Sequence, residues 1–256
     1  MRTEWILVLL LLIGTAMGRI AAADEQAPDG RVVLDGAALR YEGEITKTMN
    51  QRAFELYESS DPRPTTLRIR SVGGEINAGM DLGDFVFDHE LAVEVSELCF
   101  SSCANYVITA ARSVRLAPTA ILGWHGGATQ QIDPETIPVI VKGKELAGTD
   151  PQAQIARSAI RELMRDQIER ETAFFAKIGV DQRITILGHS DFYRDRQKDG
   201  QRYGGWHYSL EDLRRLGVRS VSVIGGSKWE PGELPGGVKL YRVELESTPA
   251  APSATP

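Results

Sequence analysis

The stretch TLRIRSVGGEINAGM, residues 66–80, contains the clearest change of pattern in the chain. Residues 66–71 alternate polar and apolar side chains and are rich in β-forming types, which predicts a short strand. Gly73 and Gly74 end this strand, because paired glycines let the backbone turn tightly. Apolar residues then recur at helical spacing from Ile76 to His89, so the stretch predicts a strand, a sharp turn and a helix.

The alternation of strand and helix continues on both sides of this stretch. Before it, two short strands at Arg31–Leu34 and Ala38–Tyr41 precede a helix at Thr46–Tyr57. After it, the predicted elements are a strand at Leu91–Val95, a buried helix at Ala104–Ala111 and strands at Ser113–Leu116 and Ala120–Trp124. This order implies βαβ units, so we predict an α/β fold with a mainly parallel sheet and flanking helices.

The second half of the chain is dominated by one long helix. It is expected to begin at Asp150–Pro151, where aspartate suits a cap and proline the first turn, and to stop at Gly179. Its apolar stripe consists of Ile155, Ala159, Ile160, Leu163, Met164, Ile168 and Phe175. The other predicted elements are a β-rich island at Ile137–Val141 inside a loop, a short helix at Ser209–Leu216, a strand at Val218–Ile224 and strand-like residues within Trp229–Val243. Residues 191–205 receive no assignment.

The composition is that of an ordinary globular protein. Of the 256 residues, 42% are hydrophobic and 25% are charged. We predict one domain over residues 24–246, with a core that needs no metal or disulfide framework. Residues 247–256 contain only Ser, Thr, Pro and Ala and predict a flexible tail. The net charge of -6 argues against nucleic-acid binding, which requires a basic face.

The first residues have the features of a secretory signal peptide. An apolar run extends from Trp5 to Gly14, and Ala21 and Ala23 have the spacing of a cleavage site. We expect removal of residues 1–23, which would leave a soluble mature protein in the periplasm or outside the cell. The alternative is an uncleaved membrane anchor, although the run is shorter than the ~20 residues that a spanning helix needs.

Three clusters, each following a predicted strand, could carry chemistry, because ligands of open α/β sheets bind beyond the carboxyl ends of strands. The first is Ser71-Val72-Gly73-Gly74. A helix begins just after it, so backbone N–H groups without helical partners could hold an oxyanion. The alternative is a simple strand-to-helix turn.

The second cluster, Cys99-Phe100-Ser101-Ser102-Cys103-Ala104, lies between a predicted strand and a predicted helix. A serine on such a turn is exposed like the serine of a nucleophile elbow, which makes Ser101 a candidate nucleophile. The N–H of Ser102 would then be a second oxyanion donor. The alternative is that Ser101 or Ser102 only caps the helix.

Cys99 and Cys103 are the only cysteines in the chain. In an oxidising compartment they could form a disulfide that clamps the turn around Ser101. The alternative is two small buried thiols. No metal site is expected, because two cysteines without matched partners do not make a zinc site.

The third cluster, Trp124-His125-Gly126-Gly127, places a histidine at the end of a predicted strand. His125 is the candidate general base, which must reach the serine through space rather than along the chain. The alternative is a histidine that only hydrogen-bonds at a strand end. Of the others, His89 ends a predicted helix, and His189 and His207 lie beside the unassigned segment.

The order and spacing of these clusters resemble the ClpP-like serine peptidase family of the ClpP/crotonase superfamily. The resemblance is greatest to exported, uncharacterised ClpP-like proteins with a Cys-x-Ser-x-Cys signature. It extends from about Val32 to His125, and more weakly to about Val223. The matching motifs are the G-x-I segment at Tyr41–Ile45, S-P-G-G with Val72 in place of proline, G-G-x-x-x-A-G-M at Gly73–Met80 and R-L-A-P at Arg115–Pro118.

The resemblance implies a ββα-repeat core of the ClpP/crotonase type that assembles into a homo-trimer or hexamer. It implies Ser101 as nucleophile and His125 as general base, with an oxyanion hole at Gly73–Gly74 and Ser102. The family's third catalytic residue is an aspartate after the long helix. That region does not align cleanly here, so Asp191 is the first candidate and Asp195 the second.

The resulting prediction is an exported serine hydrolase, a peptidase that works without ATP or any cofactor on exported or membrane-associated polypeptides. A second hypothesis is a non-catalytic ClpP-fold protein that binds peptides or protein partners. The unclear aspartate and the cysteine pair favour it. A third is a crotonase-type acyl-CoA enzyme, against which export argues because coenzyme A is cytosolic.

Overall fold

The computed structural model describes residues 30–130, 132–190, 193 and 203–245. The predicted signal peptide, residues 1–23, and the predicted tail, residues 247–256, lie outside the described residues. The chain divides into two compact units. Residues 132–170 belong to the smaller unit, and the remaining described residues belong to the larger one. No helix within the described ranges is long and apolar enough to cross a membrane.

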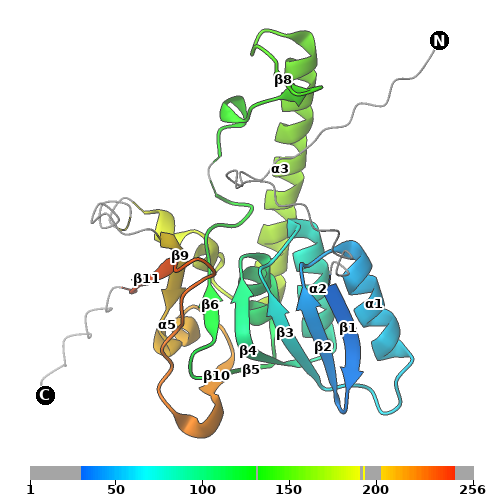
Figure 1. Ribbon diagram of the computed structural model, residues 1–256, viewed down its shortest axis with the longest axis vertical. Helices are drawn as coiled ribbons and strands as arrows, with labels where there is room; N and C mark the ends of the chain where they lie inside the picture. Colours follow the sequence, from blue (N-terminus) through cyan, green and yellow to red (C-terminus); the bar gives the residue numbers. More distant parts are fainter. Residues whose placement is uncertain (1–29, 131, 191–192, 194–202, 246–256) are drawn as a thin grey trace, which may run out of the picture. The chain divides into compact units, whose positions relative to one another are not determined.

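The larger unit is built on a seven-stranded, mainly parallel sheet, as the sequence predicts (Figure 1). Its strands are β1 (Gly30–Asp35), β2 (Ala38–Gly43), β3 (Thr66–Ser71), β4 (Ala92–Phe100), β5 (Ser113–Leu116), β6 (Ile121–Gly123) and β10 (Ser220–Val223). The order is β1-β2-β3-β4-β5-β10, with β6 paired to β4. Only β1 is antiparallel to its neighbour, β2.

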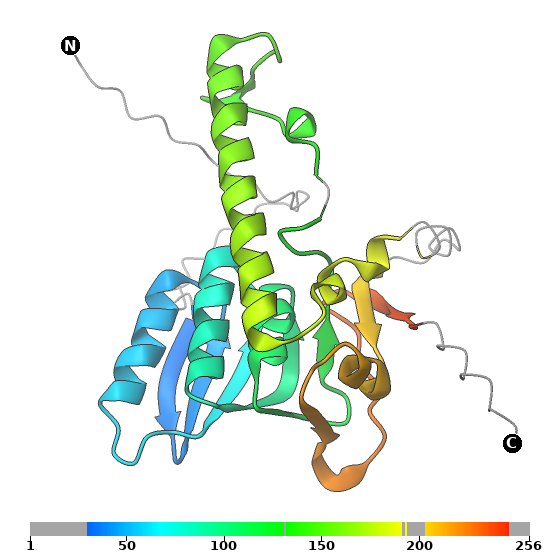
Figure 2. The same cartoon turned by 180° about the vertical axis from the view of Figure 1, so that it is seen from behind.

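Helices α1 (Lys47–Glu58) and α2 (Ile76–Asp88) lie side by side on one face of this sheet (Figure 2). Both agree with the predicted helices to within one residue. Thr46 caps α1 by accepting a hydrogen bond from the Met49 amide, as N-cap residues do. Phe54 of α1 packs on Phe85 of α2, with ring centroids 4.5 Å apart.

The two faces of the sheet differ sharply in polarity. One in-register row is buried and apolar: Leu39, Leu67, Val93, Val114 and Val221. The next row is Arg40, Arg68, Glu94, Arg115 and Ser222, in which Glu94 forms ion pairs with Arg68 and Arg115. The strands therefore alternate in the sequence because only one face of the sheet is buried in the core.

The helical segment after β4 is a π-helix, η1 (Cys103–Ile108), and all six of its residues are buried. The predicted buried helix at Ala104–Ala111 is thus correct in position, but its hydrogen-bonding pattern is wider than that of an α-helix. Strand β4 also runs on to Phe100, beyond the predicted end at Val95. It does so because its last residues pair with β6 rather than with β5.

A second, two-stranded parallel sheet consists of β9 (Tyr203–Tyr208) and β11 (Lys239–Val243). The sequence prediction missed β9, which begins inside the unassigned segment. Trp206 of β9 and Trp124 exchange two backbone hydrogen bonds of 2.8 and 2.9 Å. This antiparallel bridge joins the small sheet to the chain immediately before His125.

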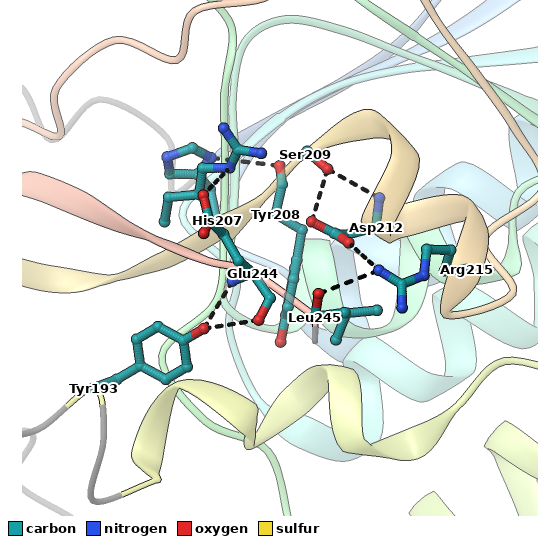
Figure 3. Close-up of polar contacts among 9 residues, drawn as sticks. Tyr193, His207, Tyr208, Ser209, Asp212, Arg215, Glu244 and Leu245 are labelled. Carbon is teal, nitrogen blue, oxygen red and sulfur yellow. Dashed lines mark hydrogen bonds and ion pairs between the residues drawn. The ribbon is translucent and has the colours of Figure 1, made fainter. Parts of the chain in front are cut away.

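Polar contacts hold the chain just after β11 (Figure 3). The Tyr193 hydroxyl accepts a hydrogen bond from the Glu244 amide at 2.8 Å and donates to the Glu244 carbonyl at 2.9 Å. Arg215, at the end of helix α5 (Leu210–Arg215), donates to the Leu245 carbonyl at 3.3 Å. Ser209 caps α5 by accepting a hydrogen bond from the Asp212 amide. These contacts anchor the two residues that follow β11.

The smaller unit contains a 3-10 turn, η2 (Pro134–Thr136), a hairpin of β7 (Ile140–Val141) and β8 (Lys144–Glu145), and the first part of α3 (Pro151–Ile178). The long helix starts and ends where the sequence predicts. Its predicted apolar stripe is not buried throughout, since Ile155 is 68% exposed and Leu163 is 44% exposed. Phe175, which belongs to the larger unit, is buried.

Candidate active site

Ser101 lies on the turn between β4 and η1 in a strained conformation. Its φ angle is 58°, a region that residues other than glycine rarely adopt. The Ser101 amide donates to the Gly123 carbonyl at 3.1 Å, and its carbonyl accepts from the Asn105 amide at 2.8 Å. The end of β6 and the start of η1 thus hold the turn from both sides. Strain that surrounding structure maintains in this way clusters at functional sites.

His125 reaches Ser101 directly. Its Nε2 atom lies 2.7 Å from Ser101 Oγ, a hydrogen-bonding distance. The pairing of β4 with β6 explains this approach, because the two strands end at the same edge of the sheet. The imidazole stacks on Phe100, with centroids 5.0 Å apart and planes 15° from parallel. The two residues that the sequence singled out are therefore brought together.

The environment of His125 favours the neutral imidazole. Surrounding protein atoms desolvate the ring, although part of the residue remains exposed, and this burial lowers the pKa of His125. The electrostatic influence of His189 lowers the same pKa further. A neutral imidazole can accept a proton, as a general base must.

His189 is a site residue that the sequence analysis did not select. It lies at the end of a 3-10 turn, η4 (Leu187–His189), and its Nε2 atom is 3.0 Å from the His125 carbonyl oxygen. Because a carbonyl only accepts, His189 must donate from Nε2. Trp206 packs edge-on against the His189 ring at 4.9 Å. No sequence motif marks this role, since it depends on chain segments 64 residues apart.

The glycine turn lies directly against the Ser101 turn. Gly73 has a φ angle of 98°, and a Cβ atom at this position would lie only 2.7 Å from Ser101 Cβ and 2.9 Å from the Ser102 nitrogen. The Ser102 hydroxyl donates to the Gly74 carbonyl at 2.7 Å. Ser102 makes no side-chain capping bond to η1. The helix-cap alternative therefore does not describe either serine hydroxyl.

Two backbone amides at this contact make no hydrogen bond within the described part of the protein. Ile45 pairs with the residues on either side of Gly74. Its amide donates to the Gly73 carbonyl, and its carbonyl accepts from the Glu75 amide. Within the described part of the chain, the amides of Gly74 and Ser102 donate to no protein acceptor. They are the two donors proposed from the sequence for an oxyanion.

Cys99 and Cys103 form a disulfide, with Cα atoms 5.3 Å apart. Both residues are fully buried. The bond links the end of β4 to the start of η1 and so spans the Ser101 turn. The structure thus contains the clamp rather than two free thiols. A loop this short contributes little chain entropy, so its expected effect is on local geometry.

The disulfide makes a simple prediction about reactive thiols. Protein denatured without reductant should show none in a DTNB assay, and protein denatured after reduction should show both cysteines. The paired samples control for accessibility, because denaturation exposes both side chains equally. Two reactive thiols before reduction would contradict the clamp.

Asp191 and Asp195, the candidates for a third catalytic residue, lie outside the described residues. Within the described ranges, no side chain bonds to Nδ1 of His125, and no cluster of three or more His, Cys, Asp or Glu residues could hold a metal ion. The site that the structure does describe consists of a serine, a histidine and two backbone donors.

The fold and this site define an α/β protein with a mainly parallel sheet and a hydrogen-bonded serine–histidine pair where two adjacent strands end. The chain matches no protein-family model and no curated protein.

Proposed function

We propose that the protein is a serine hydrolase with Ser101 as nucleophile and His125 as general base. The observation that carries this proposal is the 2.7 Å contact between Ser101 Oγ and His125 Nε2, made by a serine on a strained turn. A serine hydroxyl is a weak nucleophile until an adjacent base takes its proton. A purely structural serine would need neither the base nor the strain.

The chemistry that follows is acyl transfer. Ser101 Oγ attacks a substrate carbonyl carbon while its proton passes to His125 Nε2, and the carbonyl oxygen becomes an oxyanion. The amides of Gly74 and Ser102 stabilise this oxyanion, as preorganised donors do in other hydrolases. His125 then returns the proton to the leaving group, and the acyl-enzyme is hydrolysed by water through the same base.

The substrate class in this proposal is polypeptide, and the reaction needs neither ATP nor a cofactor. This part rests on the resemblance to ClpP-like peptidases, which also suggests the ClpP/crotonase ββα core, a trimer or hexamer and Asp191 as the residue that orients His125. Export to the periplasm or beyond is supported by the disulfide, because such bonds persist in oxidising compartments.

A non-catalytic protein that binds peptides is the second candidate. It is favoured by the lack, within the described residues, of a carboxylate bonded to the His125 ring. An unoriented histidine lowers catalysis by a triad severely. The same turn, with the amides of Gly74 and Ser102, could then hold the backbone of a bound peptide.

Covalent labelling with a fluorophosphonate probe tests the proposal. We expect the mature wild-type protein to be labelled and the Ser101→Ala variant not to be, because the acceptor oxygen is absent. Ser96→Ala is the matched control, since Ser96 is exposed on the same strand and should leave labelling unchanged. The same wild-type preparation, assayed before the probe is added, should also cleave casein without ATP.

Two results would count against this function. A folded wild-type protein that takes up no label would remove the hydrolase proposal and leave peptide binding as the candidate. Label that persists in Ser101→Ala would show that another residue is the nucleophile.

A further inference from the structure

Glu171 is a completely buried carboxylate on α3, within the larger unit. Five hydrogen bonds reach its two oxygens. Oε1 accepts from the Tyr106 hydroxyl at 2.7 Å and from the Ala128 amide at 3.0 Å. Oε2 accepts from the amide and the hydroxyl of Thr129, both at 3.1 Å, and from the Gln182 side chain at 3.2 Å. All five partners are donors, which is the set that an ionised carboxylate requires.

Retaining this group in the core is expensive. A buried charge costs free energy unless it is paired or fully hydrogen-bonded. Within the described residues Glu171 forms no ion pair. The free-energy cost of its burial is therefore offset by hydrogen bonds from neutral donors. An apolar side chain could fill the same space without that cost. The retained carboxylate and its five donors therefore point to a role beyond packing.

Four of the five donors come from the two segments that carry the proposed catalytic residues. Tyr106 lies on η1, the π-helix that follows Ser101. Ala128 and Thr129 belong to the loop that follows His125. Asn105, next to Tyr106, makes a second link by donating to the Gly126 carbonyl at 2.8 Å. One carboxylate thus ties the segment behind the nucleophile to the segment behind the base.

Burial raises the pKa of Tyr106 well above its ordinary value, and the adjacent Glu171 charge raises it further. Tyr106 therefore stays protonated and can donate at any ordinary pH. The Tyr106 donor in the link between η1 and the His125 loop is therefore present throughout this range.

We propose that Glu171 is a positioning residue that sets the alignment of His125 with Ser101 through the loop at residues 126–129. The inference rests on the proposed function for its effect on rate, but the alignment itself can be measured without activity. Glu171 touches neither reacting side chain. Its role is to keep the loop and η1 in a fixed position relative to each other.

The first test is Glu171→Gln, which preserves the shape but puts an amide NH₂ group opposite donors. The maximal labelling rate of Ser101 at saturating fluorophosphonate should fall about a hundredfold, since a displacement of about 1 Å has this effect on positioned groups. The half-saturating probe concentration should not change, because Glu171 does not contact the probe. Glu169→Gln, the same change at an exposed position of α3, should alter neither value.

Tyr106→Phe is the second variant, for the case that Glu171→Gln does not fold. It removes one hydrogen bond and retains the charge and the other four donors. A smaller drop in maximal labelling rate, about tenfold, is expected from this partial release. A folded variant that labels at the wild-type maximal rate would overturn the positioning role.

Titration of the His125 ring by NMR separates this inference from the proposed function. Loosening the loop should expose the ring and raise the His125 pKa in both variants, toward its ordinary value. This readout applies even if the wild-type protein takes up no label. An unchanged His125 titration in a folded Glu171→Gln protein would show that the carboxylate only stabilises the core.

Discussion

Replacing His125 with alanine is expected to slow fluorophosphonate labelling of Ser101 by about 10²- to 10⁴-fold, the usual contribution of a general base. The reason is the direct contact between Nε2 and Ser101 Oγ, because the proposed function makes this ring the acceptor of the serine proton. The measurement is the rate of probe uptake by folded protein. His89→Ala, at the end of α2, is the matched control and should label at the wild-type rate.

The pH dependence of labelling should report the same residue. His125 accepts the proton only when neutral, and burial together with His189 lowers its pKa. Labelling should therefore remain fast down to a pH below the ordinary histidine value of about 6.5 and decline only under more acidic conditions. His189→Gln retains an N–H for the His125 carbonyl but removes the imidazole, so the midpoint should move upward.

Two observations would contradict this role for His125. One is a His125→Ala protein that labels as fast as the wild type. The other is a wild-type rate that already halves well above pH 7, since that would require a histidine pKa raised rather than lowered.

The Gly73→Ala variant should lose both stability and labelling. The backbone at Gly73 has a φ angle of 98°, which costs a residue with a side chain about 1–3 kcal/mol. The added Cβ would also lie 2.7 Å from Ser101 Cβ and 2.7 Å from the Phe100 carbonyl oxygen. Overpacking of this kind costs about 1–3 kcal/mol more. Relief of the contact would move the Ser101 turn, so labelling should fall along with the free energy of unfolding.

Gly36→Ala is the control that separates backbone strain from steric contact. Gly36 has a φ angle of 61°, but a Cβ there would meet nothing within 4 Å. We expect a cost of about 1–2 kcal/mol from the left-handed conformation and unchanged labelling. Urea unfolding gives the stabilities of both variants. If Gly73→Ala and Gly36→Ala lose the same free energy of unfolding and both label normally, a steric role for Gly73 is refuted.

Local patterns in the sequence predict most of the larger unit correctly. The strand at residues 66–71 and helices α1 and α2 match because their signals lie within each segment: alternation, 3.6-residue spacing, and caps or glycines at the ends. The predicted short helix at Ser209–Leu216 corresponds to α5, which has a serine cap and an acidic first turn. Strand β9, which begins inside the unassigned segment, was missed. Its pairing with Trp124 is visible only in three dimensions.

The exposed part of α3 shows the opposite failure. Helical periodicity predicts a continuous apolar stripe, yet Ile155 and Leu163 are exposed while Phe175 is buried. Periodicity gives the faces of a helix but not which of its turns meet a partner. The π-helical form of η1 was also not predicted. Its residues indicate a buried helix but not the hydrogen-bonding pattern of that helix.

Local sequence patterns were enough to identify the candidate groups of the site: a serine on a strand-to-helix turn, a histidine at a strand end and glycines just before a helix. These positions can be recognised because strands, turns and helix starts have local sequence signals that agree with the overall fold. Only the packed structure shows that Ser101 and His125 touch, that Cys99 and Cys103 are joined, and that His189 and Glu171 bond to the chain at and after His125. Apart from the disulfide, whose cysteines are four residues apart, these contacts join separate segments of the chain. Burial makes the hydrogen bonds among them obligatory only once the core has closed around them.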